Sequence, residues 1–89
     1  MTVNDAVAKR ITKLLIEKGI TQYRLEQESG IQHGSMQCIM NGRNKTVTLS
    51  TIYMIAKGFH ITFLEFLDDD VFRDENIEFE WYRKTFVLH

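Results

Sequence analysis

The side chains of this 89-residue chain that could do catalytic or metal chemistry are three histidines and one cysteine. His33, His60 and His89 have no Ser, Cys, Asp or Glu partner at a spacing typical of catalytic motifs. Cys38 cannot form an internal disulfide, and it does not stand with the histidines at the spacing of zinc ligands. The sequence also contains no Gly-rich phosphate loop. We therefore expect a protein that is not an enzyme and that uses no metal and no cofactor.

The chemistry that remains is hydrogen bonding and charge, and the charge is unevenly distributed. The net charge of −1 is unfavourable for binding a polyanion, but it conceals two opposite segments. Residues 1 to 67 hold eight Lys/Arg against five Asp/Glu, which gives +3. Residues 68 to 89 hold three against seven, which gives −4. We expect a binding domain at 1–67 and an acidic, aromatic C-terminal tail at 68–89.

Helical elements must position the polar groups of the first segment. With 44% hydrophobic and 26% charged residues, the composition is typical of a packed globular domain. Apolar residues at helical spacing, together with capping residues and glycines, predict an all-α fold of five helices. The predicted helices run from a cap at Asn4 to Gly19, from a cap at Thr21 to Ser29, from about Gln32 to Met40, from a cap at Thr48 or Ser50 to about Gly58, and from a cap at Thr62 through Phe66.

The second and third predicted helices have the spacing of a helix-turn-helix. A helix that reads duplex DNA must be held across a second helix by a tight turn, so that its N-terminal side can enter the major groove. Leu25 lies in the first helix of the pair, Gly30 and Ile31 follow in the turn, and Met36 and Ile39 lie in the second helix. These positions supply the bend and the inner contacts that such a pair needs.

At these residues the chain resembles the lambda-repressor/Cro (Xre-like) family of helix-turn-helix transcription regulators. The resemblance lies in TQYRL, SGI and MQCIMNGR and in the later TIYMIAKGFHITFLEFL, and it covers about residues 4 to 67. It implies a transcriptional repressor whose partner is double-stranded DNA. The single cysteine fits a reducing cytoplasm.

The resemblance also implies two sets of DNA contacts. Phosphate contacts fix register and orientation, whereas base contacts specify the sequence. The phosphate contacts are expected at Gln22, Asn41, Arg43, Lys45 and Arg10. The base-reading positions fall on Gln32, His33, Gly34, Gln37 and Cys38. Gln32 and Gln37 can pair bidentately with adenine, His33 can bond a purine edge, and Gly34 would let the backbone come close.

The chain departs from the family pattern in three ways. Glu26 stands where a small residue, usually Ala, lets the motif helices approach, so we expect its side chain to turn outward. Met40 replaces an acid that in many relatives pairs with an arginine of the first helix, which would leave Arg10 able to reach a phosphate. The recognition helix has no Arg or Lys before Arg43, so the commonest guanine contact is absent and A·T-rich half-sites are expected.

The tail at 68–89 is expected to pack against the core or to join two copies of the chain. Apolar residues alternate with glutamates from Ile77 to Trp81, which predicts a short β-strand, and a helix containing Ile77, Trp81 and Tyr82 is the alternative. A homodimer would match the two-fold symmetry of operators. The aromatic residues available for either role are Phe72, Phe79, Trp81, Tyr82 and Phe86.

A protein-interaction module or an antitoxin with a toxin partner is the competing hypothesis, because fold alone does not decide function. Glu26 and the missing recognition-helix arginine favour this alternative. Gln22, Asn41, Arg43 and Lys45 favour DNA, since a module released from phosphates does not need that set. No apolar run approaches the roughly 20 residues that span a bilayer, so we expect no membrane partner.

Overall fold

The structure is a computed structural model that describes residues 1–75 and 77. This part of the chain forms α1 (Val3–Lys18), α2 (Gln22–Ser29), α3 (His33–Met40), α4 (Leu49–Gly58), α5 (Phe63–Leu67) and the 3-10 helix η1 (Asp70–Arg73). The predicted all-α fold with five α-helices is confirmed. The predictions for the tail from residue 78 onward lie outside the described residues. Within the described part, every helix is too short or too polar to cross a membrane.

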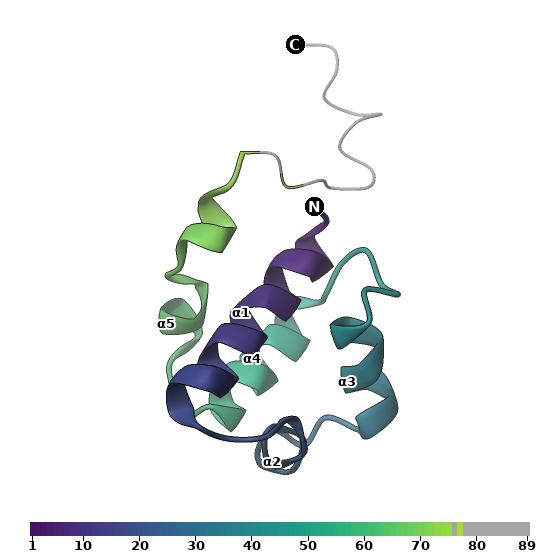
Figure 1. Ribbon diagram of the computed structural model, residues 1–89, viewed down its shortest axis with the longest axis vertical. Coiled ribbons are helices and arrows are strands. Elements are labelled where there is room, and N and C mark those ends of the chain that lie inside the picture. The colour runs from purple at the N-terminus through teal and green to yellow at the C-terminus, as the bar shows by residue number, and fades with distance from the viewer. Residues whose placement is uncertain (76, 78–89) are drawn as a thin grey trace.

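The helices are arranged so that α3 has one side of the molecule to itself. Figure 1 shows α1 and α4 in the middle, with α3 and the loop after it on one side and α5 with η1 on the other. The short helix α2 lies across one end and is seen nearly end-on, so it crosses α3. The outer surface of α3 is therefore separated from the acidic segment around η1.

Threonines begin four of the α-helices. The hydroxyl oxygens of Thr21, Thr48 and Thr62 each accept a hydrogen bond from the backbone N–H three residues later. Thr21 and Thr62 were predicted, and of the two candidates for the fourth helix, Thr48 and Ser50, Thr48 is the cap. The prediction that Asn4 caps the first helix is wrong. Thr2 caps α1, and it forms a capping box with Asp5.

Asn4 instead joins the start of α1 to the end of α3. Its side chain is fully buried, and its Nδ2 donates to the Ile39 carbonyl at 2.9 Å. Its backbone N–H donates to the Lys45 carbonyl at 3.2 Å. These two hydrogen bonds from Asn4 hold the end of α3 and the loop after it at a defined distance from the start of α1.

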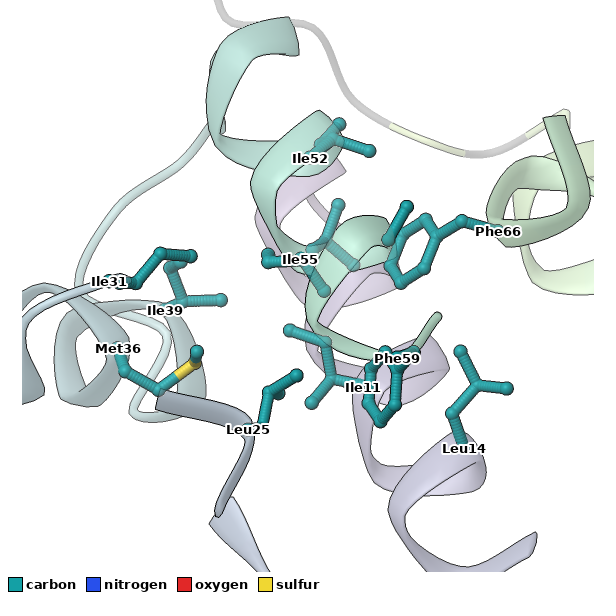
Figure 2. Packing of buried hydrophobic residues seen from close by; sticks show 12 residues of the cluster. Ile11, Leu14, Leu25, Ile31, Met36, Ile39, Ile52, Ile55, Phe59 and Phe66 are labelled. Carbon is teal, nitrogen blue, oxygen red and sulfur yellow. The ribbon is translucent and has the colours of Figure 1, made fainter. Parts of the chain in front are cut away.

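The core contains residues from all five α-helices and from the turn after α2. Figure 2 shows Leu25, Ile31, Met36 and Ile39 converging on Ile55 of α4, with Phe66 of α5 approaching from the opposite side. Burial of these side chains supplies most of the force that holds the short helices together, since helices of this length are marginal alone. The buried cluster consists of Val7, Ile11, Leu14, Leu25, Ile31, Met36, Ile39, Ile52, Ile55, Ala56, Phe59 and Phe66.

The close approach of α2 to α4 depends on Gly58. A Cβ at Gly58 would lie 2.8 Å from Ser29 Cβ and 3.0 Å from Leu25 Cδ1. We expect Gly58→Ala to lower the free energy of unfolding by about 2 kcal/mol, because α2 must shift to make room. Gly34→Ala is the matched control, since a Cβ there meets nothing within 4 Å and should add about 0.5 kcal/mol of helix stability. Urea denaturation of both variants checks this, and equal stabilities would contradict the close approach.

Arg10 fastens α1 to the end of α5. Its Nε donates to the Phe66 carbonyl at 2.8 Å and its Nη2 to the Glu65 carbonyl at 2.9 Å. A weaker ion pair joins Nη1 to Asp69 at 3.4 Å, and the guanidinium lies 5.9 Å from the centre of the Phe66 ring. The cation thus occupies the C-terminal end of α5, where a positive charge is favourable and the last carbonyls of the helix run short of backbone partners.

Asp69 makes the stability of this corner depend on pH. The Lys13 ammonium at 2.8 Å, followed by the Val71 N–H, holds the pKa of Asp69 below its usual value. A lowered folded-state pKa stabilises the fold above the unfolded value, near 3.9, and that contribution is lost as the pH falls through the folded pKa. We expect Asp69→Asn to be less stable than wild type at neutral pH and equal to it in strong acid. Urea denaturation across this pH range tests it, and a pH-independent difference would contradict it.

Candidate nucleic-acid interface

The turn between α2 and α3 is built on Gly30. This residue ends α2 in the left-handed conformation, with φ of 78°, and its N–H donates to the Glu26 carbonyl. Residues that carry a side chain rarely adopt this backbone conformation, so glycine allows a tight turn at this position. Gln32 then caps α3 with extended backbone, and two helices of eight residues each are held across one another.

The inner side of α3 is buried and its outer side is polar. Met36 and Ile39 are almost fully buried against the core, as is Ile31 in the preceding turn. Gln32, His33 and Gly34 are exposed at the N-terminal end of the helix, and Gln37 and Cys38 are half-buried. The five residues implicated in base reading therefore lie at the start and along one flank of α3, and none of them belongs to the core.

Glu26 lies under this surface, between α2 and α3. The prediction that its side chain turns outward is wrong: only 9% of the side chain is exposed. Gln22 Nε2 donates to its carboxylate at 3.0 Å, and His33 Nδ1 lies 3.0 Å from both carboxylate oxygens. These polar partners explain why the longer side chain is accommodated between the two helices, where a small one was expected.

The electrostatics of Glu26 follow from the same contacts. Chiefly the hydrogen bond from the Gln22 amide, and further that from His33, hold the pKa of the Glu26 carboxyl below its usual value, although burial acts in the opposite direction. The carboxylate is therefore ionised at neutral pH. His33 is itself 67% exposed, and its Nε2 lies 3.3 Å from Gln37 Nε2. We call Gln22, Glu26, His33 and Gln37 the motif network.

The loop after α3 presents amide and basic side chains next to the recognition helix. Asn41 ends α3, Gly42 adopts a φ of 72°, and the Arg43 N–H donates to the Cys38 carbonyl at 3.1 Å. Asn41, Arg43 and Lys45 are all exposed. Since the Lys45 carbonyl accepts the bond from the Asn4 N–H, the backbone of this loop is anchored to the start of α1.

Arg10 does not belong to this surface. The expectation that Met40 leaves it able to reach a phosphate is wrong, because its guanidinium is used by the carbonyls of Glu65 and Phe66 and by Asp69. Arg10 is only 8% exposed, and its hydrogen bonds place it against α5 and the segment that leads into η1. Its positive charge is therefore compensated within the fold.

The structure brings together three of the predicted contact residues, namely Gln22, His33 and Gln37, in the motif network. The residue that connects them, Glu26, was noticed in the sequence only as a departure from the family pattern. The spacing of four between Gln22 and Glu26, and again between His33 and Gln37, was the available signal, because side chains four apart on a helix are neighbours. The contact between Glu26 and His33, which links the two pairs across the turn, depends on tertiary structure.

Comparison with known proteins adds a family to this geometry. The family model of the Cro/C1-type HTH DNA-binding domain matches residues 10–70. The match includes α2, α3, the loop after α3, α4 and α5. No curated protein and no solved structure matches the chain.

Proposed function

This chain belongs to the Cro/C1-type helix-turn-helix DNA-binding family, and on that basis we propose that it is a transcriptional repressor that binds its operator sequence-specifically. In this proposal α3 enters the major groove and α2 lies across the phosphate backbone. A domain bound in this way blocks transcription when its site overlaps a promoter. The chain acts on double-stranded DNA in the cytoplasm.

The observation that carries the proposal is the outer surface of α3. Its N-terminal end exposes polar side chains and a glycine, while its opposite side is buried against α1 and α2. A major groove about 12 Å wide admits a helix presented in this way. Gln32 and Gln37 then bond adenine, His33 bonds a purine edge, Gly34 permits close approach, and Cys38 contributes a weak contact at the edge of the interface.

A phosphate clamp, made of Gln22, Asn41, Arg43 and Lys45, holds the helix in register. Gln22 gives one amide hydrogen to Glu26, which leaves its second amide hydrogen for a phosphate oxygen. Asn41, Arg43 and Lys45 are exposed on the anchored loop at the other end of α3. Contacts at both ends of a recognition helix fix its orientation without reading sequence.

Selection of binding sites from a randomised duplex library tests the proposal. Since α3 carries no Arg or Lys, we expect enriched half-sites rich in A·T pairs. A G-rich consensus would contradict the assigned base contacts. Failure to enrich any sequence would contradict sequence-specific binding itself.

The proposed active form is a homodimer. A single α3 reads one half-site, and two copies related by a two-fold axis read half-sites about 34 Å apart. The predicted dimer element is the tail at 68–89. Among its aromatic residues the structure describes Phe72, whose ring centre lies 5.9 Å from that of Phe66. The library should therefore yield inverted repeats. Size-exclusion chromatography of a chain without residues 74–89 tests whether the tail contributes to dimerisation.

A protein-interaction module, such as an antitoxin, is favoured by a different observation. Leu49, Tyr53 and Leu64 are each more than 60% exposed, and the Tyr53 ring stacks on Phe63 at 5.8 Å. Exposed apolar side chains on adjoining helices are typical of protein-contact surfaces. A mobility shift at two salt concentrations separates the hypotheses, because phosphate contacts make DNA binding salt-dependent, whereas absent or salt-insensitive binding favours the protein partner.

A further inference from the structure

The motif network has a direction that its chemistry determines. An ionised carboxylate can only accept hydrogen bonds. Because both oxygens of Glu26 lie 3.0 Å from His33 Nδ1, the hydrogen of a neutral His33 ring must be on Nδ1. His33 Nε2 then carries a lone pair, and it accepts a hydrogen bond from Gln37 Nε2 at 3.3 Å.

The orientation of the Gln37 amide follows from this tautomer. One Nε2 hydrogen of Gln37 is used by His33, which leaves the second Nε2 hydrogen and Oε1 for a DNA base. One donor beside one acceptor matches adenine, whose N7 accepts and whose N6 donates in the major groove. If the ring hydrogen were on Nε2 of His33, the Gln37 amide would turn over to present two donors, which match O6 and N7 of guanine.

We infer that Glu26 is a positioning residue for base recognition, which fixes the His33 tautomer and through it the face that the Gln37 amide presents to DNA. The inference rests on the proposed function in its DNA-reading step, whereas the tautomer is a property of the free protein. Glu26 touches no base in this account. It acts from beneath the surface, between α2 and α3, where it is buried and charge-bearing.

The tautomer can be measured without DNA. Long-range ¹H–¹⁵N correlation spectra of the full chain, recorded at mildly alkaline pH, distinguish a protonated from an unprotonated ring nitrogen. We expect His33 of the wild type to be protonated on Nδ1, and Glu26→Ala to lose this preference. Alanine is small enough for the two helices to keep their approach, and circular dichroism of the variant checks that the fold is retained. A wild-type His33 protonated on Nε2 would overturn the inference.

The effect on specificity is measured with the selected operator. The base pair read by Gln37 is identified as the one at which Gln37→Ala loses its preference. At this pair we expect the wild type to favour adenine over guanine by about tenfold or more, and Glu26→Ala to lose or reverse that preference. Gln22→Ala is the matched control, because it removes the other partner of Glu26 and should weaken binding to all sequences alike while the tautomer and base preference stay unchanged.

The outcomes separate the inference from the proposed function. A Glu26→Ala variant that folds, binds and keeps the wild-type preference for adenine overturns the inference and leaves the proposed function standing. A wild-type chain that binds no duplex overturns the proposed function and the DNA-reading step with it. In that case the spectra of the free protein still decide whether Glu26 fixes the tautomer.

Discussion

Arg10→Met is expected to lower the free energy of unfolding by about 3 kcal/mol and to leave the DNA affinity of the folded protein unchanged. Methionine fills a similar volume, but it cannot donate to the Glu65 and Phe66 carbonyls, which lie 2.9 and 2.8 Å from the Arg10 guanidinium nitrogens. The Glu65 carbonyl also accepts a hydrogen bond from the Asp68 N–H, but both carbonyls stand at the end of α5, where helical partners run out. Urea denaturation measures the first effect, and titration of a labelled operator at a temperature where the variant is folded measures the second.

Lys13→Met is the matched control for Arg10→Met. Lys13 bonds the same carboxylate, Asp69, but its side chain is 56% exposed, so solvent screens the pair and the loss of stability should be much smaller than for Arg10→Met. Weaker DNA binding by folded Arg10→Met would restore Arg10 to the phosphate contacts. Equal stability of the two variants would contradict the structural role given to Arg10.

The double substitution Arg43→Ala/Lys45→Ala is expected to weaken binding of every duplex by about tenfold per residue lost, since each removes a charged phosphate contact. The plot of log affinity against log salt should become shallower by about 0.9 for each contact. Base preference should not change, because phosphate contacts carry no sequence information. Fluorescence anisotropy titrations over a range of salt concentrations measure both quantities.

Lys57→Ala is the control for the phosphate clamp. Lys57 is exposed in the last turn of α4, outside the clamp and outside α3, so its loss should leave the salt slope nearly unchanged. A similar change of slope in this variant would mean that general positive charge attracts DNA, and the clamp would lose its assignment.

The caps and the helix pattern of this fold were readable from sequence because they are local. Thr21 and Thr62 each precede an apolar-periodic segment and cap it as predicted, and Thr48 is one of the two caps predicted for α4. Before the first helix two residues that can cap, Thr2 and Asn4, stand close together, and Asn4 was the wrong prediction. The spacing of Thr2 and Asp5 allows a capping box and therefore favours Thr2 as the cap.

The two wrong side-chain predictions concern partners that local pattern does not contain. Arg10 is bonded to groups 55 to 59 residues away, at the end of a five-residue helix. Glu26 meets His33 only because Gly30 turns the chain between them. In both cases the family pattern suggested that the side chain points outward, whereas in the structure it turns inward to polar partners that only the tertiary fold brings near.

Removal of single major-groove atoms from the operator tests most directly whether α3 reads bases. In the selected duplex, adenines are replaced by 7-deazaadenine, which lacks the N7 acceptor while the minor groove and the phosphates are unchanged. We expect binding by the wild type to weaken by about tenfold at the adenine paired with Gln37, and binding by Gln37→Ala to be insensitive to the same replacement. Wild-type affinity that is unchanged at every replaced adenine would contradict reading of the major groove by α3.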